Sequence, residues 1–295
     1  MTTSSGQNYL AIPGPSVVPD EVLRSMHRPA PNIYEGELIE ITESLIQDLN
    51  YVARSSGKVA MYIANGHGIW EAALSNMVSK GDYILVIATG RFAYGWAEMA
   101  KRMEIKIDIV DFGKDKALDV ETVSKKLLSQ PKNKYKAILL TQVDTSTSVK
   151  NDIKSLRKKL TEIECPSLLA VDCIASLACD RFEMDAWGVD VMVAACQKGL
   201  MVPPGMGFVF FNHRAEEHQK ELKNVSLYWD WEPRVNPSRY YEYFCGTAPT
   251  HHIYGLRTAL DMIKNEEIEK TWKRHEILSQ AIWAAVDRWS LGSDI

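Results

Sequence analysis

The stretch VAACQKGLMVPPGMGFVFF, residues 193–211, sets a single lysine, Lys198, between two hydrophobic runs. Both runs have the length and composition of buried strands, and a Pro-Pro-Gly turn follows the lysine at 203–205. A lone ammonium group is costly to place between buried strands. Lys198 therefore either extends its head to solvent from a strand end or serves as a reactive amine.

The rest of the chain alternates between short apolar runs and helical patterns. Helical spacing of apolar residues predicts helices over 68–78 and 152–163. Continuous apolar strands that alternate with helices indicate a mainly parallel sheet covered on both faces, a three-layer α/β fold. The seven predicted strands are 59–64, 83–88, 105–110, 137–142, 168–172, 190–195 and 207–211.

Composition narrows the class of protein. The 295 residues are 46% hydrophobic and 24% charged, with a net charge of −4, so we expect neither nucleic acid nor membrane as a partner. The five cysteines form no CxxC pair and no Cys/His zinc spacing, so we expect no metal site and reduced thiols. The polar start lacks a signal-peptide pattern, which favours a cytoplasmic protein.

Chemistry-bearing residues fall where strands end. Asn65-Gly66-His67-Gly68 links a strand to a helix, either as an ordinary glycine turn or as a phosphate site at a helix N-terminus. Asp172 closes a strand, where it could cap the next helix or pair with a cationic ligand nitrogen. A hydroxyl-rich turn spans 143–148. Together with the amine of Lys198, these groups match what pyridoxal phosphate requires.

On these residues the sequence resembles the class V, fold-type I pyridoxal-phosphate aminotransferases, specifically the alanine/serine/aspartate–glyoxylate group. The resemblance runs from PGPSVVP at 13–19 to YGLRTALDMI at 254–263, and NGHGIWEAAL at 65–74 is among its most specific pieces. The separation of Asp172 and Lys198, 198 − 172 = 26 residues, also matches the family.

The resemblance implies a role for each matching residue. Lys198 would be the Schiff-base lysine, and Asp172 the partner of the pyridinium nitrogen. Gly14 and Ser16 would lie beside the substrate. The remaining cofactor contacts would come from Asn65, Gly66, His67, Phe92, Thr145, Gln197 and Thr247, with Thr247 acting from the partner subunit of a homodimer. Either Tyr243 or Phe244 would match a phosphate-binding tyrosine.

Two residues depart from the family pattern: Gly199 follows the lysine where the family usually has Ala, and Ser148 stands where Gly is common. We expect an N-terminal arm at 1–20, a large cofactor-binding domain at 21–263 and, at 264–295, a helix leading toward a small domain that is largely absent. That domain carries the family's carboxylate-binding arginine, and no motif marks Arg91, Arg181 or Arg257 as its substitute. We therefore expect weak transamination from this chain and full activity from a longer form.

The function implied is transfer of an amino group from alanine, serine or aspartate to glyoxylate or another small 2-oxo acid. Two alternatives stay open: a lyase or decarboxylase that uses the same cofactor, and a truncated, non-catalytic member of the family.

Overall fold

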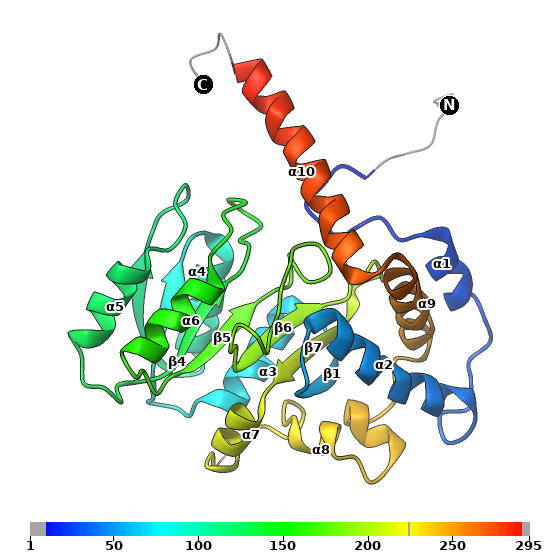
Figure 1. The fold of residues 1–295 in the computed structure, drawn as a ribbon. Coiled ribbons are helices and arrows are strands. Elements are labelled where there is room, and N and C mark those ends of the chain that lie inside the picture. The colour runs from blue at the N-terminus through cyan, green and yellow to red at the C-terminus, as the bar shows by residue number, and fades with distance from the viewer. Residues whose placement is uncertain (1–9, 224, 291–295) are drawn as a thin grey trace.

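The computed structural model describes residues 10–223 and 225–290 (Figure 1). Each of the seven predicted strands is present, with ends within two residues of those expected. The strands are β1 (Lys58–Ala64), β2 (Tyr83–Ala88), β3 (Lys106–Asp111), β4 (Tyr135–Thr141), β5 (Leu168–Asp172), β6 (Val191–Ala195) and β7 (Gly205–Phe211).

One sheet joins these strands in the order β1-β7-β6-β5-β4-β2-β3. The pairs from β6 through β3 are parallel, whereas β7 runs antiparallel to both β6 and β1. The mainly parallel sheet predicted from the sequence is confirmed. Because Ala64 at the end of β1 pairs with Gly205 at the start of β7, the segment after β1 reaches the same sheet edge as the ends of the parallel strands.

Helices cover both faces of the sheet (Figure 1). They are α1 (Asp20–Met26), α2 (Glu37–Ala53), α3 (Gly66–Met77), α4 (Arg91–Arg102), α5 (Val120–Leu128), α6 (Ile153–Glu162), α7 (His213–Lys220), α8 (Glu232–Val235), the 3₁₀ helix η1 (Tyr240–Phe244), α9 (Thr250–Glu266) and α10 (Ile268–Ser290). One core cluster joins α3, α4 and α7 to one face, and a second joins α2, α5, α6 and α9 to the other. These two apolar layers fix the three-layer architecture.

The last helix leaves the body of the protein (Figure 1). Only its first turns carry buried residues, Ile268, Thr271 and Trp272. The domain boundary expected after residue 263 falls within the last turn of α9, and residues 1–9 and 291–295 of the expected end segments lie outside the described residues. Among the helices of the described chain, none is long and apolar enough to cross a membrane.

Candidate active site

A pocket of about 290 Å³ opens where the strands end at one edge of the sheet. It is reached from β1 through Asn65, from β2 through Phe92, from β4 through Thr145 and from β6 through Lys198. Its full lining is Gly14, Pro15, Asn65, Gly66, His67, Trp70, Phe92, Thr145, Ile174, Gln197, Lys198 and Pro204. Eight of the eleven residues singled out from the sequence therefore meet in one place, because strand ends converge at one edge of a parallel sheet.

Asp172 lies beneath this pocket rather than on its surface, with 4% of its area exposed. Its carboxylate accepts a hydrogen bond from the indole of Trp70 at 2.9 Å and one from the backbone N–H of Ile174 at 2.7 Å. Burial raises the pKa of Asp172 to about 7, against the lowering effect of these two donors. Of the two readings of Asp172, the helix-cap reading is wrong, because turns and no helix follow β5.

The amine of Lys198 donates a hydrogen bond to the carbonyl of Pro13 at 3.0 Å. Burial lowers the pKa of Lys198, which favours the uncharged, nucleophilic amine. Gly14 has a φ of 149°, which favours glycine, and a Cβ atom there would lie 2.0 Å from the Lys198 Nζ, so the lysine head would have to move. The Lys198 amine is therefore held against the N-terminal segment and does not extend freely into solvent.

The N-terminal segment forms a strap across the lysine, held by Ser16. The backbone N–H of Ser16 donates to Gln197 O at 2.8 Å, and its hydroxyl donates to Lys198 O at 2.9 Å. The side-chain Oε1 of Gln197 is buried without a hydrogen-bond partner among the described residues. A buried oxygen of this kind calls for a donor from a ligand or water.

The helix α3 begins at the pocket. Asn65 caps it by accepting hydrogen bonds from the N–H groups of His67 and Gly68 at 3.1 and 3.2 Å. Because Asn65 already accepts from these two N–H groups, the feature that would attract an anionic group here is the positive end of the helix dipole. The glycine-containing segment at 65–68, predicted as a phosphate site, therefore lies at the start of a helix in the pocket wall.

Asp144 positions the opposite wall, and the sequence reasoning did not single it out. Its buried carboxylate accepts hydrogen bonds from the N–H groups of Phe92 and Ala93 at 2.9 and 3.3 Å, and so caps α4. A Cβ on Gly90 would meet this carboxylate at 2.3 Å. The glycine before Arg91 is therefore what allows Asp144 to hold Phe92 in place.

The two departures from the family pattern have different causes. Ser148 has a φ of 59°, the left-handed region where glycine is favoured, so a side chain is tolerated there at some strain. At Gly199 an added Cβ would lie 2.2 Å from the carbonyl oxygen of Leu177. Alanine, usual in the family, does not fit this backbone.

Besides Asp172, four residues predicted from the sequence lie outside the pocket lining. Ser16 lines a neighbouring cavity, and Thr247 is exposed in the segment between η1 and α9. Neither candidate for the phosphate-binding tyrosine reaches the pocket: Phe244 is buried in the core, and Tyr243 packs against Tyr240. These two residues stabilise η1 within this chain.

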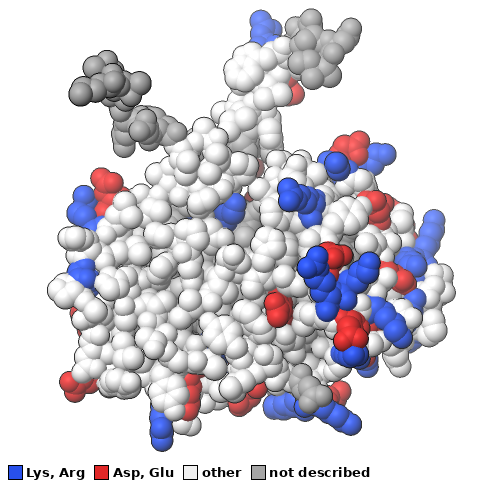
Figure 2. All heavy atoms as spheres, turned by 180° about the vertical axis from the view of Figure 1, so that it is seen from behind, with Lys and Arg blue, Asp and Glu red and all other residues white. Residues whose placement is uncertain are grey.

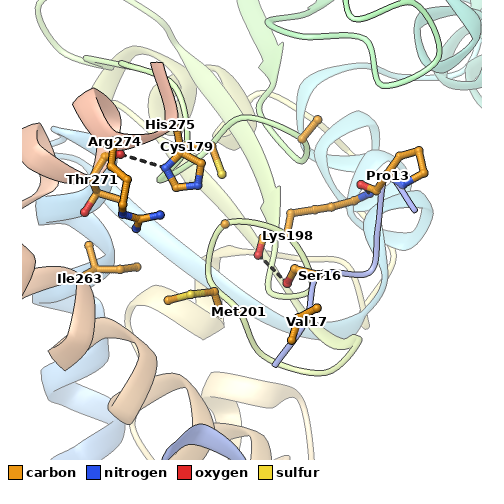
Figure 3. Close-up of a pocket in the computed structure, with 12 residues that line it drawn as sticks. Pro13, Ser16, Val17, Cys179, Lys198, Met201, Ile263, Thr271, Arg274 and His275 are labelled. Carbon is orange, nitrogen blue, oxygen red and sulfur yellow. Dashed lines mark hydrogen bonds between the residues drawn. The ribbon is translucent and has the colours of Figure 1, made fainter. Parts of the chain in front are cut away.

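The neighbouring cavity, of about 300 Å³, lies on the other side of the strap and contains an arginine that sequence reasoning missed, Arg274. Figure 3 shows the Lys198 side chain running toward Pro13 and away from Arg274. Arg274 forms two hydrogen bonds, at 2.6 and 2.8 Å, with the carboxylate of Glu266. Of the arginines considered from sequence, Arg257 pairs with Asp48 and Asp261, and Arg181 pairs with Glu183.

The sheet order, the glycine-flanked helix start and the lysine after β6 together define a class: the three-layer α/β fold of the aminotransferases. Comparison with known proteins gives the family. The sequence pattern of the Aminotransferase class-V family matches residues 9–290. This chain belongs to that family, whose members depend on pyridoxal phosphate.

Relatives and a solved structure agree with this assignment. The serine–glyoxylate aminotransferase of Arabidopsis thaliana is 32% identical over 97% of this chain and 72% of its own length. The L-aspartate–glyoxylate aminotransferase of Paracoccus denitrificans is 28% identical over 97% of this chain and 72% of its own length. The crystal structure of an alanine–glyoxylate aminotransferase from Nostoc sp. superposes with a TM-score of 0.86 at 23% identity, covering 96% of this chain and 76% of that one, and shows the same fold.

Proposed function

We propose that this protein is a pyridoxal-phosphate aminotransferase that moves an amino group from a small amino acid to glyoxylate or a similar 2-oxo acid. The observation that carries the proposal is one pocket lined by Lys198 and by Trp70, whose indole binds the buried carboxylate of Asp172 behind the pocket wall. The amino donors serine and aspartate and the acceptor glyoxylate come from the names of the relatives.

The residues present fit the cofactor. Asp172 is buried with hydrogen bonds from neutral groups, so a cationic ring nitrogen would stabilise its ionised form. Gln197 offers a buried oxygen that lacks a donor, and the positive end of the α3 helix dipole would attract a phosphate. Phe92 would form an aromatic wall beside the ring, and Thr145 would offer a hydroxyl to the ring oxygen. When bound, pyridoxal phosphate supplies a protonated pyridine ring that withdraws electrons from the substrate's Cα.

Lys198 would then have two tasks. Its amine, whose pKa burial lowers, would bind the cofactor covalently, and once displaced by the substrate it would move the proton at the substrate's Cα. Asp172 would hold a proton on the ring nitrogen throughout. The strap at 13–16 would position the amine through the carbonyl of Pro13.

Borohydride reduction tests the proposal. The purified protein should be yellow, and reduction should fix the cofactor on the peptide that contains Lys198. Lys198→Ala should abolish both the label and amino transfer from alanine, serine or aspartate to glyoxylate. Lys220→Ala, which changes an exposed lysine paired with Glu217 on α7, is the matched control and should change neither.

A label on another lysine contradicts the assignment of Lys198. Release of CO₂ or elimination without amino transfer would instead identify a decarboxylase or lyase.

A homodimer is the second part of the proposal. Thr247 is exposed and lies outside the pocket, which supports a role at the site of a second copy. Figure 2 shows charged side chains gathered toward one side of the rear face, with a broad area that carries few of them. Mixing inactive Lys198→Ala chains with Thr247→Val chains should restore activity at one site of the mixed dimer. A fully active monomer in sedimentation would contradict this.

A further inference from the structure

Trp70 connects the candidate pocket to Asp172. It lies in the second turn of α3, has 1% of its surface exposed, and lines the pocket with an edge of its ring. Its indole N–H donates to Asp172 Oδ2 at 2.9 Å, across 102 residues of sequence. An indole N–H is a donor only, so this bond is made to an ionised or acceptor oxygen.

The surroundings of Trp70 hold its ring in one orientation. Trp96 stacks on it with centroids 6.0 Å apart and an angle of 15°, and the Trp96 indole donates to Trp70 O at 3.3 Å. On another side, His67 lies 4.7 Å from the ring centroid. A Cβ on Gly95 would come within 3.1 Å of the ring, so this glycine leaves the space the indole occupies. A donor fixed in this way also fixes its acceptor.

The Asp172 carboxylate is held at both oxygens, because Oδ1 accepts from the N–H of Ile174 at 2.7 Å while Oδ2 accepts from Trp70. We propose that Trp70 is a positioning residue that keeps the Asp172 carboxylate oriented toward the pocket and ionised, so that a proton stays on the ring nitrogen of the cofactor. This inference rests on the proposed function. Trp70 touches the pocket, but it would act on the ring nitrogen through Asp172.

Electrostatics agree with the geometry. Burial pushes the pKa of Asp172 up to about 7, while the bonds from Ile174 and Trp70 oppose the rise. Two charged groups also face Asp172: Asp144 raises its pKa further, and Lys198 lowers it. Cys173, next along the chain, stays a neutral thiol because burial and Asp172 raise its own pKa. Loss of the Trp70 donor would therefore let Asp172 take up a proton, and a neutral acid no longer stabilises a cationic ring.

The test uses the cofactor-free protein, so that its readout does not depend on activity. Infrared spectra recorded across pH report the protonated carboxyl of Asp172 as the band lost in Asp172→Asn. Trp70→Phe removes the N–H and should move the midpoint of that band upward by about one pH unit. Trp231→Phe is the matched control: it removes the N–H of another buried indole, one without a hydrogen-bond partner among the described residues, and should leave the midpoint in place. Equal midpoints in Trp70→Phe and Trp231→Phe would overturn the inference.

A second variant covers the case in which Trp70→Phe fails to fold. β-(3-Benzothienyl)alanine at position 70 keeps the shape of indole and replaces only the N–H with sulfur, so the same upward shift is expected. In the cofactor-loaded enzyme, either Trp70 variant should have a kcat about tenfold lower than that of the unaltered protein, with KM unchanged. Borohydride labelling of the unaltered protein separates the two ideas. No label on Lys198 contradicts the proposed function, whereas a label on Lys198 with an unmoved midpoint contradicts only the role of Trp70.

Discussion

Two buried aspartates stand at opposite ends of neighbouring strands and are treated differently by the fold. Asp172 closes β5, whereas Asp190 directly precedes β6, about three residues or roughly 10 Å away along the sheet. Asp190 is fully buried and pairs with Arg157 at 3.0 Å and Arg214 at 2.8 Å. It also accepts bonds from Asn212 and from the N–H of Leu169.

Asp172, in contrast, accepts its hydrogen bonds from a neutral indole and a neutral amide. A carboxylate paired with two guanidinium groups has its charge balanced inside the fold, and its task is structural. A carboxylate buried with neutral donors beneath a pocket is instead ready for a cation that a ligand brings. Burial alone therefore does not distinguish an aspartate of a ligand site from a structural aspartate. The charge of the groups that bind its carboxylate does.

The largest expected effect is a loss of stability when Asp190, the structural aspartate, is changed. Asp190→Asn keeps the shape of the side chain but leaves Arg157 and Arg214 without a counter-charge. The free energy of unfolding should fall by about 3 kcal/mol, the lower end of the range for a broken buried ion pair, because Arg214 is partly exposed. Urea unfolding measures this. Catalysis per folded molecule should be unchanged, and a specific loss of turnover would erase the contrast between the two residues.

Asp172→Asn should give the opposite result. The charge that would stabilise the protonated ring is lost, so kcat should fall roughly a hundredfold, the value of a hydrogen bond between charged groups. The folded state should be as stable as the unaltered protein or more so. Steady-state kinetics and urea unfolding on the same preparation check both halves. Near-normal turnover would mean that Asp172 is structural, like Asp190.

Asp144 sharpens the comparison as an intermediate case, a buried carboxylate that caps a helix at the pocket wall. Asp144→Ala should lower the free energy of unfolding by about 1–2 kcal/mol through loss of the cap and should weaken cofactor binding, because Phe92 is released. The control is Asp119→Ala, which removes the cap of α5 at Thr122, away from the pocket. It should cost similar stability and leave the affinity for the cofactor unchanged; equal affinity in both variants would contradict the role of Asp144.

The smallest effect is a pH dependence in the cofactor-free protein. The pKa of Asp172 is about 7 when folded and 3.8 as the ordinary value. Between these values the folded state retains a proton that the unfolded state has lost, so stability falls as pH rises. The advantage of Asp172→Asn over the unaltered protein should grow by about 1 kcal/mol between pH 6 and 7, because the slope decreases as pH approaches the folded pKa. Urea titrations at three pH values test this, and parallel curves would contradict it.

Much of the fold could be predicted because its signals are local. The seven strands are continuous apolar runs between turn residues, and their ends marked Asn65, the turn at 143–148, Asp172 and Lys198, whereas Phe92 and Thr145 were singled out by the family resemblance. The strand β7 had the same composition as its parallel neighbours, so composition alone could not reveal its antiparallel direction.

What sequence reasoning missed depends on contacts between distant segments. Trp70 appeared as one more apolar residue in a helical pattern, and a buried indole signals only that some acceptor is near, not which one. Asp144 was hidden in a hydroxyl-rich turn, because its role depends on a helix more than fifty positions earlier. Arg274 falls within the strong helical pattern at the end of the chain, where an arginine on a helix surface is ordinary.

The strap across Lys198 has a consequence for how the protein is made. Its contacts join Ser16 and Pro13 to Lys198 across 182 and 185 residues. At 5–20 residues per second, a ribosome needs about 10–40 s to synthesise the intervening chain. During that time the strap has no partner to bind, so an early segment of the chain is among the last to dock. Protease protection of arrested nascent chains should therefore appear at residue 16 only after Lys198 has left the exit tunnel.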